Sequence, residues 1–339
     1  MNEAIRHYTN EFRSRRDVSP YDADVLFDGL ITETDEDALA SLLSAWSTKG
    51  STEDELYRFA SIMRGRMTPL DTKGLECVDI VGTGGSRAKT FNVSTAAAFV
   101  IAGAGIPVAK HGNRAATSSS GSADALSLLG VNVDIDPKIA EKSLADAGIC
   151  FMFAPRFHSL SLHLAKARRR VEGPTIFNCI GPLCNPAGVG HQVIGVWSRD
   201  LVRKMANVLV RLGTKRSWIV NGHDKLDEIS LTGHSSLAEV TETGVSQFDV
   251  NPQDMGITSF NGDLPQDCSP QESADVIRNV LDGKLADSDP EKLVLINAAA
   301  AIFIAGGSTD LRGAYDAAKE SISSGAAAKK LAQVVKLTK

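Results

Sequence analysis

The sequence is poor in cysteine, carries little net charge and lacks a long apolar run. Its five cysteines form no CxxC pair and no His–Cys spacing typical of a metal site, which predicts free thiols in a reducing compartment. A net charge of −5 on 339 residues argues against a general nucleic-acid binder, which must neutralise many phosphates. The apolar run at 96–109 is too short and glycine-broken to span a bilayer. Because the N-terminal segment is charged, no signal peptide is expected, and these absences together predict a cytoplasmic protein without nucleic-acid or membrane partners.

The pattern of the chain changes near residue 67. Upstream of it the pattern is helical, with Thr52 and Glu55 spaced as a capping box. An apolar stripe typical of a core or an interface falls at helical spacing, at Leu39, Leu42, Leu43 and Trp46. We therefore predict a helical domain at 1–68 and an α/β domain at 69–339.

Strand and helix patterns alternate in the second of these domains. Strands are expected at 78–81, 106–109, 131–135, 150–154, 191–197 and 216–222. Helices are expected at 92–104, after Ser120, at 137–148, at 201–212 and in the alanine-rich C-terminal stretch. The predicted fold class is α/β, with a small N-terminal helical domain and a mainly parallel sheet flanked by helices.

A glycine-rich turn after the first predicted strand has the character of a phosphate-binding loop. Gly82, Gly84 and Gly85 leave backbone N–H groups uncovered, and a helix start at 92–95 adds hydroxyl donors and the positive end of its dipole. Lys110 follows the next strand and supplies a fixed positive charge. The Walker A and dinucleotide-binding patterns both fail here, so from the residues alone a merely structural tight turn remains possible.

Seven blocks of sequence carry a more specific signal. They are GTGG at 82–85, TFNVSTAAAF at 90–99, VAKHGNR at 108–114, SGSAD at 120–124, FAPRFH at 153–158, TIFNCIGPLCNPAG at 175–188 and LDEISLTG at 226–233. In these blocks, and over nearly its whole length, the chain resembles the anthranilate phosphoribosyltransferases. The pyrimidine-nucleoside phosphorylases share the fold and a Lys-His-Gly-like turn, but lack the NPA and LDEISLTG blocks in this form.

The resemblance implies a nucleoside phosphorylase/phosphoribosyltransferase-like fold and a defined reaction. The 5-phosphoribosyl group of phosphoribosyl pyrophosphate (PRPP) would pass to the amine of anthranilate, giving N-(5-phosphoribosyl)anthranilate and pyrophosphate in tryptophan biosynthesis. It also implies Mg²⁺, as two ions, and a homodimer whose contact is formed largely by the helical domain.

The same resemblance implies the site residues. PRPP would be bound by Gly82, Gly85, Ser86, Thr90, Asn92, Val93, Ser94, Thr95, Lys110, Ser118 and Ser122. Anthranilate would be bound by Gly82, His111, Asn113, His158 and Arg168. The catalytic residues would be Lys110, Asn113 and Arg168, and the metal ligands Ser94, Asp227 and Glu228.

Each of these residues also has a plainer explanation. Asp227 and Glu228 are hard oxygen ligands suited to Mg²⁺, but acidic pairs are usually solvated surface. In the KARRR run at 166–170 a helix directs only one or two side chains inward, and the others form a solvated basic face. The planar guanidinium of Arg168 suits a carboxylate. Histidines such as His111 and His158 more often serve as structural hydrogen-bonding groups, and no general base is assigned.

The chain departs from the family pattern at several positions. Ser86 stands where relatives usually have aspartate, and Ser119 where they commonly have lysine or arginine. Three further departures are Ser127, Ser159 and Lys225. Since none removes an expected catalytic or metal-binding residue, we expect the activity to survive. Two other functions stay open: a nucleoside phosphorylase, and a non-enzymatic nucleic-acid-binding paralogue of the same fold.

Overall fold

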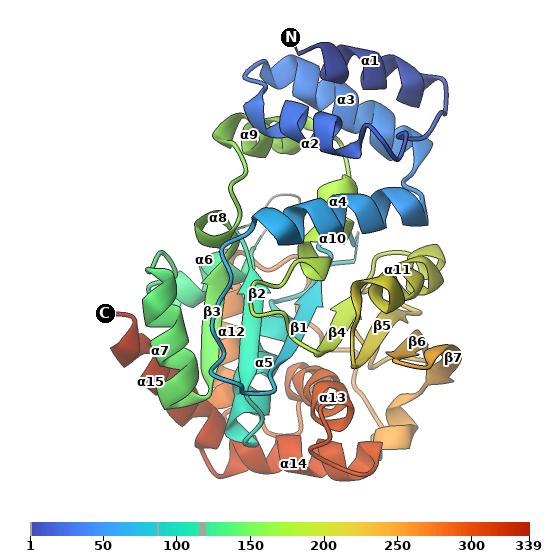
Figure 1. The fold of residues 1–339 in the computed structure, drawn as a ribbon. Coiled ribbons are helices and arrows are strands. Elements are labelled where there is room, and N and C mark those ends of the chain that lie inside the picture. Colours follow the sequence, from blue (N-terminus) through green and yellow to red (C-terminus); the bar gives the residue numbers. More distant parts are fainter. Residues whose placement is uncertain (1, 87, 115–119) are drawn as a thin grey trace.

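The computed structural model describes residues 2–86, 88–114 and 120–339, in which seven strands form one sheet (Figure 1). The strand order is β3-β2-β1-β4-β5-β6-β7. The strands are β1 Val78–Gly82, β2 Val108–Gly112, β3 Ile149–Phe153, β4 His191–Gly195, β5 Arg216–Gly222, β6 Ser235–Thr241 and β7 Gly244–Val250. Neighbouring strands pair in parallel from β3 to β5, whereas β6 and β7 are antiparallel. The prediction of a mainly parallel sheet is confirmed.

Four helices precede the sheet and lie above it in Figure 1. They are α1 Glu3–Arg13, α2 Ala23–Thr32, α3 Glu36–Lys49 and α4 Glu53–Arg66. The predicted capping box of Thr52 and Glu55 begins α4. Asp35 caps α3, accepting hydrogen bonds from two backbone N–H groups of its first turn.

Most of the remaining helices flank the sheet, whereas α9, Leu162–Arg170, lies beside the N-terminal helices (Figure 1). The other remaining helices are α5 Val93–Gly103, α6 Ser122–Leu128, α7 Pro137–Ala147, α8 Ala154–Phe157, α10 Ile176–Leu183, α11 Arg199–Leu212, α12 Pro270–Leu281, α13 Asp289–Ile304, α14 Leu311–Ser323 and α15 Ala326–Leu337, with a 3-10 turn η1 at Pro252–Met255. No helix among the described residues combines the length and apolar character that a bilayer crossing requires. All five cysteines are buried and free, as predicted.

Alternating side chains divide the interior into two main cores. In β4, Val193 faces the core formed with α5 and α12–α15, while Ile194 faces the core formed with α1–α4, α9, α10 and α11. In β5, Trp218 faces the first of these cores and Ile219 faces the second. Successive side chains of a strand point to opposite faces of the sheet, so apolar residues at neighbouring positions require helices on both faces.

The N-terminal helices share their core with the rest of the chain. Trp46 stacks between Phe12 and Phe59, with ring centroids 4.7 and 4.8 Å away. The same cluster continues into α9, α10 and α11. The predicted apolar stripe of α3 is therefore buried within the chain, and the domain boundary at residue 68 stays a prediction.

One predicted strand is wrong and one hairpin was not predicted. Residues 131–135 alternate in burial but pair with no strand among the described residues. Val131 and Val133 enter the core beneath α5, and Ile135 enters a smaller cluster beside β2 and β3. The alternation reflects packing of an irregular segment. The β6–β7 hairpin turns at residues 242–243, between Thr241 and Gly244, which pair with each other. Strand β2 extends to Gly112, so that Lys110 lies within the strand.

A buried carboxylate joins three parts of the helical region. Glu55, only 2% exposed, accepts hydrogen bonds from the backbone N–H of Val18 (2.9 Å), from Trp46 Nε1 (3.3 Å) and from Thr52 N (2.9 Å). Lys49 Nζ, 2.9 Å away, supplies the opposite charge. Removing this carboxylate leaves these three N–H donors without this acceptor, and leaves the buried ammonium of Lys49 with only the exposed carboxylate of Asp17 as an ion-pair partner among the described residues.

We expect Glu55→Ala to lower the free energy of unfolding by about 3 kcal/mol, because it breaks a buried ion pair. Urea and thermal denaturation measure this loss. The matched control is Asp54→Ala, which removes a solvent-exposed ion pair with Arg211 and should cost less than about 1 kcal/mol. Equal losses in the two variants would contradict the role given to Glu55.

Candidate active site

A cavity of about 350 Å³ opens where β1 and β2 end. Its wall contains most of the expected site residues: Gly82, Ser86, Thr90, Asn92, Ser94, Lys110, His111, Asn113, Ser122, His158, Arg168, Asp227 and Glu228. This position at the carboxyl ends of parallel strands is the usual ligand site of an open α/β sheet.

Three of the described residues expected to bind PRPP are not on this wall. Gly85 packs against Trp197, whose ring a Cβ at residue 85 would meet at 2.6 Å. The side chains of Val93 and Thr95 are buried inside α5. Ser118 lies outside the described residues, as does the departure at Ser119.

Two glycines allow an acidic segment to enter the end of the sheet. A Cβ at Gly195 would lie 1.6 Å from the carbonyl oxygen of Asp227, and one at Gly82 would lie 2.7 Å from its Oδ2. The backbone N–H of Gly84 donates to that oxygen at 2.7 Å. Side chains at the ends of β1 and β4 would exclude the segment, so these glycines are required by close approach.

The acidic pair lies in surroundings that oppose ionisation. Burial raises the pKa of Glu228 to about 8, and the neighbouring charge of Asp227 adds to this effect, while Lys110 opposes it. Burial also raises the pKa of Asp227, against the hydrogen bond from Gly84. Among the described residues no group of three or more His, Cys, Asp or Glu side chains is placed to hold a metal. Two carboxylates short of positive charge fit a hard cation that keeps water or phosphate oxygens as further ligands.

Lys110 is the buried cation nearest to this pair. Its Nζ, on a residue only 3% exposed, donates to the carbonyl of Ile80 at 2.6 Å and to Ser94 Oγ at 3.3 Å. Burial lowers its pKa, and the charges of Asp79 and Glu228 act in the opposite direction. The ammonium is thus held at the start of α5, beside the acidic pair.

Asp79 and Asn185 lie beneath Lys110 and were not singled out from the sequence. Asn185 Nδ2 donates to Asp79 Oδ2 at 2.8 Å and to the carbonyl of Ala109 at 2.9 Å. The backbone N–H of His111 donates to Asp79 Oδ1 at 3.3 Å. Burial raises the pKa of Asp79 to about 6. This network ties β1 to β2, and its only sequence signal was the NPAG block that contains Asn185.

Arg168 lines the same cavity from a different element, helix α9, and is short of partners. Its Nε is buried and has no hydrogen-bond partner among the described residues. The guanidinium lies 5.1 Å from the ring centroid of Phe177, and burial lowers its pKa to about 10. Of the KARRR run, Lys166 and Arg170 instead form ion pairs with α3. A buried cation with an unused donor is suited to an anionic group of a ligand.

Two neutral histidines also line the cavity. The Nε2 atoms of His111 and His158 are 3.1 Å apart. Burial lowers the pKa of His158 to about 4, and it lowers that of His111 well below its ordinary value. At neutral pH one ring must donate to the other, so this part of the wall is uncharged.

The loops beside Lys110 are held by their own hydrogen bonds. The side-chain oxygen of Asn92 accepts from Ser120 Oγ and Ser273 Oγ, both at 2.7 Å, so its side chain does not cap α5. Ser122 Oγ donates to the carbonyl of Asn113 at 3.3 Å. These contacts fix the shape of the cavity wall.

Ser86 joins the glycine-rich turn to the acidic segment. Its hydroxyl lies within hydrogen-bond reach of the carbonyl of Ala88, at 2.7 Å, and of the carbonyl of Lys225. Lys225 has a φ of 68°, a conformation that favours glycine. Two departures from the family pattern are therefore in direct contact. On the same turn, Asn178 Nδ2 donates to the carbonyl of Thr83 at 3.0 Å, a contact that sequence reasoning missed.

The chain is similar in sequence to known proteins over most of its length. A family model described as "Glycosyl transferase family, a/b domain" matches residues 74–328. The anthranilate phosphoribosyltransferase of Azorhizobium caulinodans is 40% identical over 323 residues, covering 95% of this chain and 92% of that protein. The enzyme of the same name from Rhodospirillum rubrum is 42% identical over 321 residues, covering 94% and 92%.

Solved structures show the same similarity. Anthranilate phosphoribosyltransferase from Thermus thermophilus superposes with a TM-score of 0.87 at 32% identity, covering 99% of both chains. The Saccharomyces cerevisiae enzyme in complex with PRPP and Mg gives 0.86 at 28% identity, covering 99% and 98%. The same yeast enzyme in complex with 4-fluoroanthranilate gives 0.84 at 27% identity, covering 98% and 97%. Neither alternative function is favoured by these similarities.

The raised pKa of Glu228 predicts a pH-dependent stability. The folded protein keeps this proton up to about pH 8, whereas the unfolded chain releases it near the ordinary value of 4.5. The stability that the proton contributes is complete below that ordinary value and is lost as the pH rises through about 8. We therefore expect the melting temperature of metal-free protein to fall less in Glu228→Gln than in the wild type between about pH 5 and 8.5. Parallel curves for the two proteins would contradict the assignment.

Proposed function

The chain belongs to the anthranilate phosphoribosyltransferase family, and from this membership we propose that it transfers the 5-phosphoribosyl group of PRPP to the amine of anthranilate, with release of pyrophosphate. The observation that carries this assignment is that one cavity is lined both by an acidic pair with a buried lysine and by a partner-poor arginine from a different element. In this proposal Asp227, Glu228 and Lys110 form a first end of the cavity, and the guanidinium of Arg168 on α9 forms a second end. A nucleoside phosphorylase would have no use for a carboxylate-binding arginine.

At the first end the chemistry is electrostatic. As the bond from the anomeric carbon to pyrophosphate breaks, negative charge grows on the leaving group and the ribose becomes cation-like. Lys110 and the start of α5 would stabilise the leaving pyrophosphate without a covalent intermediate. Mg²⁺, held by Asp227 and Glu228 with Ser94 and proposed here as two ions, would neutralise phosphate charge when bound.

At the second end Arg168 would hold the anthranilate carboxylate in a bidentate pair. Phe177 supports the guanidinium from behind, and Gly82, Asn113 and the two neutral histidines would line the space for the ring and its amine. An aromatic amine is uncharged near neutral pH and can lose its proton after attack, so we assign no general base. Binding both substrates in one cavity aligns the amine with the anomeric carbon.

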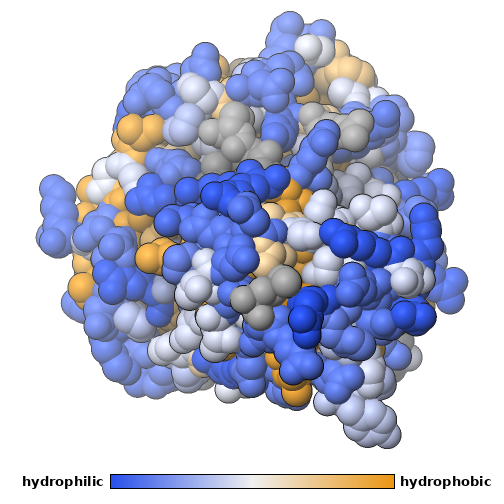
Figure 2. Space-filling model, turned by 90° about the horizontal axis from the view of Figure 1, so that it is seen from above, coloured by the Kyte–Doolittle hydropathy of each residue, from blue (hydrophilic) through white to orange (hydrophobic). Residues whose placement is uncertain are grey.

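We also propose a homodimer formed through the N-terminal helices. Seen from that side, the surface is mostly hydrophilic, with apolar side chains in small separate patches (Figure 2). Exposed large apolar side chains of this region include Tyr21, Val25 and Leu162.

The cytoplasmic location stays a prediction from the sequence.

The activity is tested by fluorescence. Purified protein with Mg²⁺, PRPP and anthranilate should lose anthranilate emission, and chelation of the metal should stop this loss. Arg168→Ala should raise the KM for anthranilate by about 100-fold, because a desolvated charge pair is lost. The KM for PRPP should stay within about twofold, since PRPP occupies the other end of the cavity.

Two outcomes would contradict the proposal. One is unchanged emission from folded protein that still binds PRPP. The other is an Arg168→Ala variant in which the KM for PRPP and the KM for anthranilate rise by the same factor. Arg168→Lys is the matched control for charge, and we expect it to restore little, because an ammonium cannot form the bidentate pair.

The contacts of Ser86 predict the effect of restoring the usual family residue. Two carbonyl oxygens face its hydroxyl, so the carboxylate of Ser86→Asp would meet acceptors instead of donors. We expect Ser86→Asp to raise the KM for PRPP by about tenfold, and Ser86→Ala to change it less. Initial rates at saturating anthranilate measure both. A lower KM in the aspartate variant would show that the serine weakens PRPP binding.

A further inference from the structure

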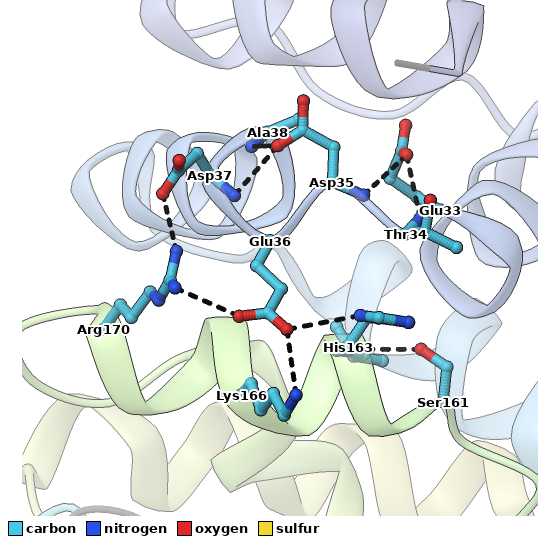
Figure 3. Close-up of polar contacts among 11 residues, drawn as sticks. Glu33, Thr34, Asp35, Glu36, Asp37, Ala38, Ser161, His163, Lys166 and Arg170 are labelled. Atoms are coloured by element: carbon cyan, nitrogen blue, oxygen red, sulfur yellow. Dashed lines mark hydrogen bonds and ion pairs between the residues drawn. The ribbon is translucent and has the colours of Figure 1, made fainter.

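Helix α9 carries Arg168 on one side and an ion-pair cluster on the other. Successive residues of a helix are about 100° apart, so Lys166 and Arg168 differ by about 200° around the axis. Leu164 and Arg168 face the interior and the cavity. His163, Lys166 and Arg170 face the N-terminus of α3 (Figure 3).

A single carboxylate from α3 contacts all three of these basic side chains. Glu36 Oε1 lies 3.2 Å from His163 Nδ1 and 3.4 Å from Lys166 Nζ. Its Oε2 lies 3.1 Å from Arg170 Nη2. Figure 3 shows Glu36 reaching from α3 down to α9 between them.

The Glu36 side chain is 18% exposed, whereas the basic side chains around it are 42 to 60% exposed. Burial acts to raise the pKa of Glu36, but the hydrogen bonds from His163 and Lys166 and the nearby positive charges lower it overall. The carboxylate is thus ionised and enclosed at neutral pH. Asp37 differs, because its side chain is 91% exposed and Arg170 is the one ion-pair partner that the described residues give it.

Helix α9 needs such tertiary contacts. It is nine residues long, and isolated helices of this length are marginal in water. On its inner side Leu164 and Ala167 are its buried apolar side chains. Ionic contacts at three successive turn positions restrict rotation and sliding of the helix.

We propose that Glu36 is a positioning residue for Arg168: by clamping the outer side of α9 to α3, it sets the place of the guanidinium that receives the acceptor's carboxylate. This inference rests on the proposed function. It makes the N-terminal helices part of the acceptor site, although none of their ionic side chains in this cluster lines the cavity.

The test compares Glu36→Gln with Asp37→Asn in the complete protein. Glutamine keeps the size of the side chain and removes its charge. A bidentate guanidinium–carboxylate pair needs a fixed geometry, so a small displacement of Arg168 should weaken the binding of anthranilate. We expect Glu36→Gln to raise the KM for anthranilate by about tenfold, while kcat and the KM for PRPP stay within about twofold. Asp37→Asn should change the KM for anthranilate by less than about twofold, since an exposed pair contributes little.

A double-mutant cycle separates positioning from general damage. If Glu36 acts through Arg168, then Glu36→Gln should add less than about twofold to the KM for anthranilate in an Arg168→Ala background. Glu36→Asp keeps the charge on a shorter arm and should fall between the wild type and Glu36→Gln. Melting temperatures of all variants show that each is folded.

Several results would overturn the inference. An unchanged KM for anthranilate in Glu36→Gln is one, and an equal rise with and without Arg168 is another. A parallel rise in the KM for PRPP would show general loosening of the structure. These failures require an active wild type, so they differ from failure of the proposed function, in which the wild type itself leaves anthranilate emission unchanged and this inference falls with it.

Discussion

The site depends on the close approach of the segment around Asp227 to the ends of β1 and β4. Glycine at residues 82 and 195 makes this approach possible, since side chains there would occupy the space of the Asp227 carboxyl and carbonyl groups. The approach brings two carboxylates into a poorly solvated crevice, raises their pKa values and leaves them short of positive charge. The positive charge of Lys110 offsets the negative charge of this acidic pair only in part. This end of the cavity is therefore suited to a metal cation together with a polyphosphate.

The opposite end of the cavity belongs to a different part of the architecture. The acidic segment and Lys110 are held by strand ends and by the start of α5, whereas Arg168 and Phe177 come from helices that share a core with α1–α4. In the proposed function the two substrates would therefore be received by groups from two different parts of the fold. Because the reaction needs both substrates in contact, the relative placement of these parts matters more than any single residue.

Much of the fold followed from local pattern. The capping box at Thr52, helix α7 and the apolar runs of β1, β3 and β5 were predicted because each depends on neighbouring residues in the chain. The prediction of a strand at 131–135 failed for the opposite reason. The alternation of this segment records burial against two different cores, and a pattern of burial does not specify a hydrogen-bonded partner. The β6–β7 hairpin was not predicted, because its strands are partly exposed and the residues of its turn carry only a weak turn signal.

By itself the sequence determined the identity of the functional groups: the glycine-rich turn, Lys110, the acidic pair and the family blocks that contain them. Only the tertiary structure decided which of these groups meet and in what state. It placed the side chains of Val93 and Thr95 in the interior and gave Ser86 and Lys225 a shared contact. It also left Arg168 Nε buried without a partner among the described residues, while Lys166 and Arg170 of the same run form ion pairs with α3. The reason is that charge state and partnership depend on burial and on distances between segments remote in the chain, whereas residue type and spacing are properties of the chain alone.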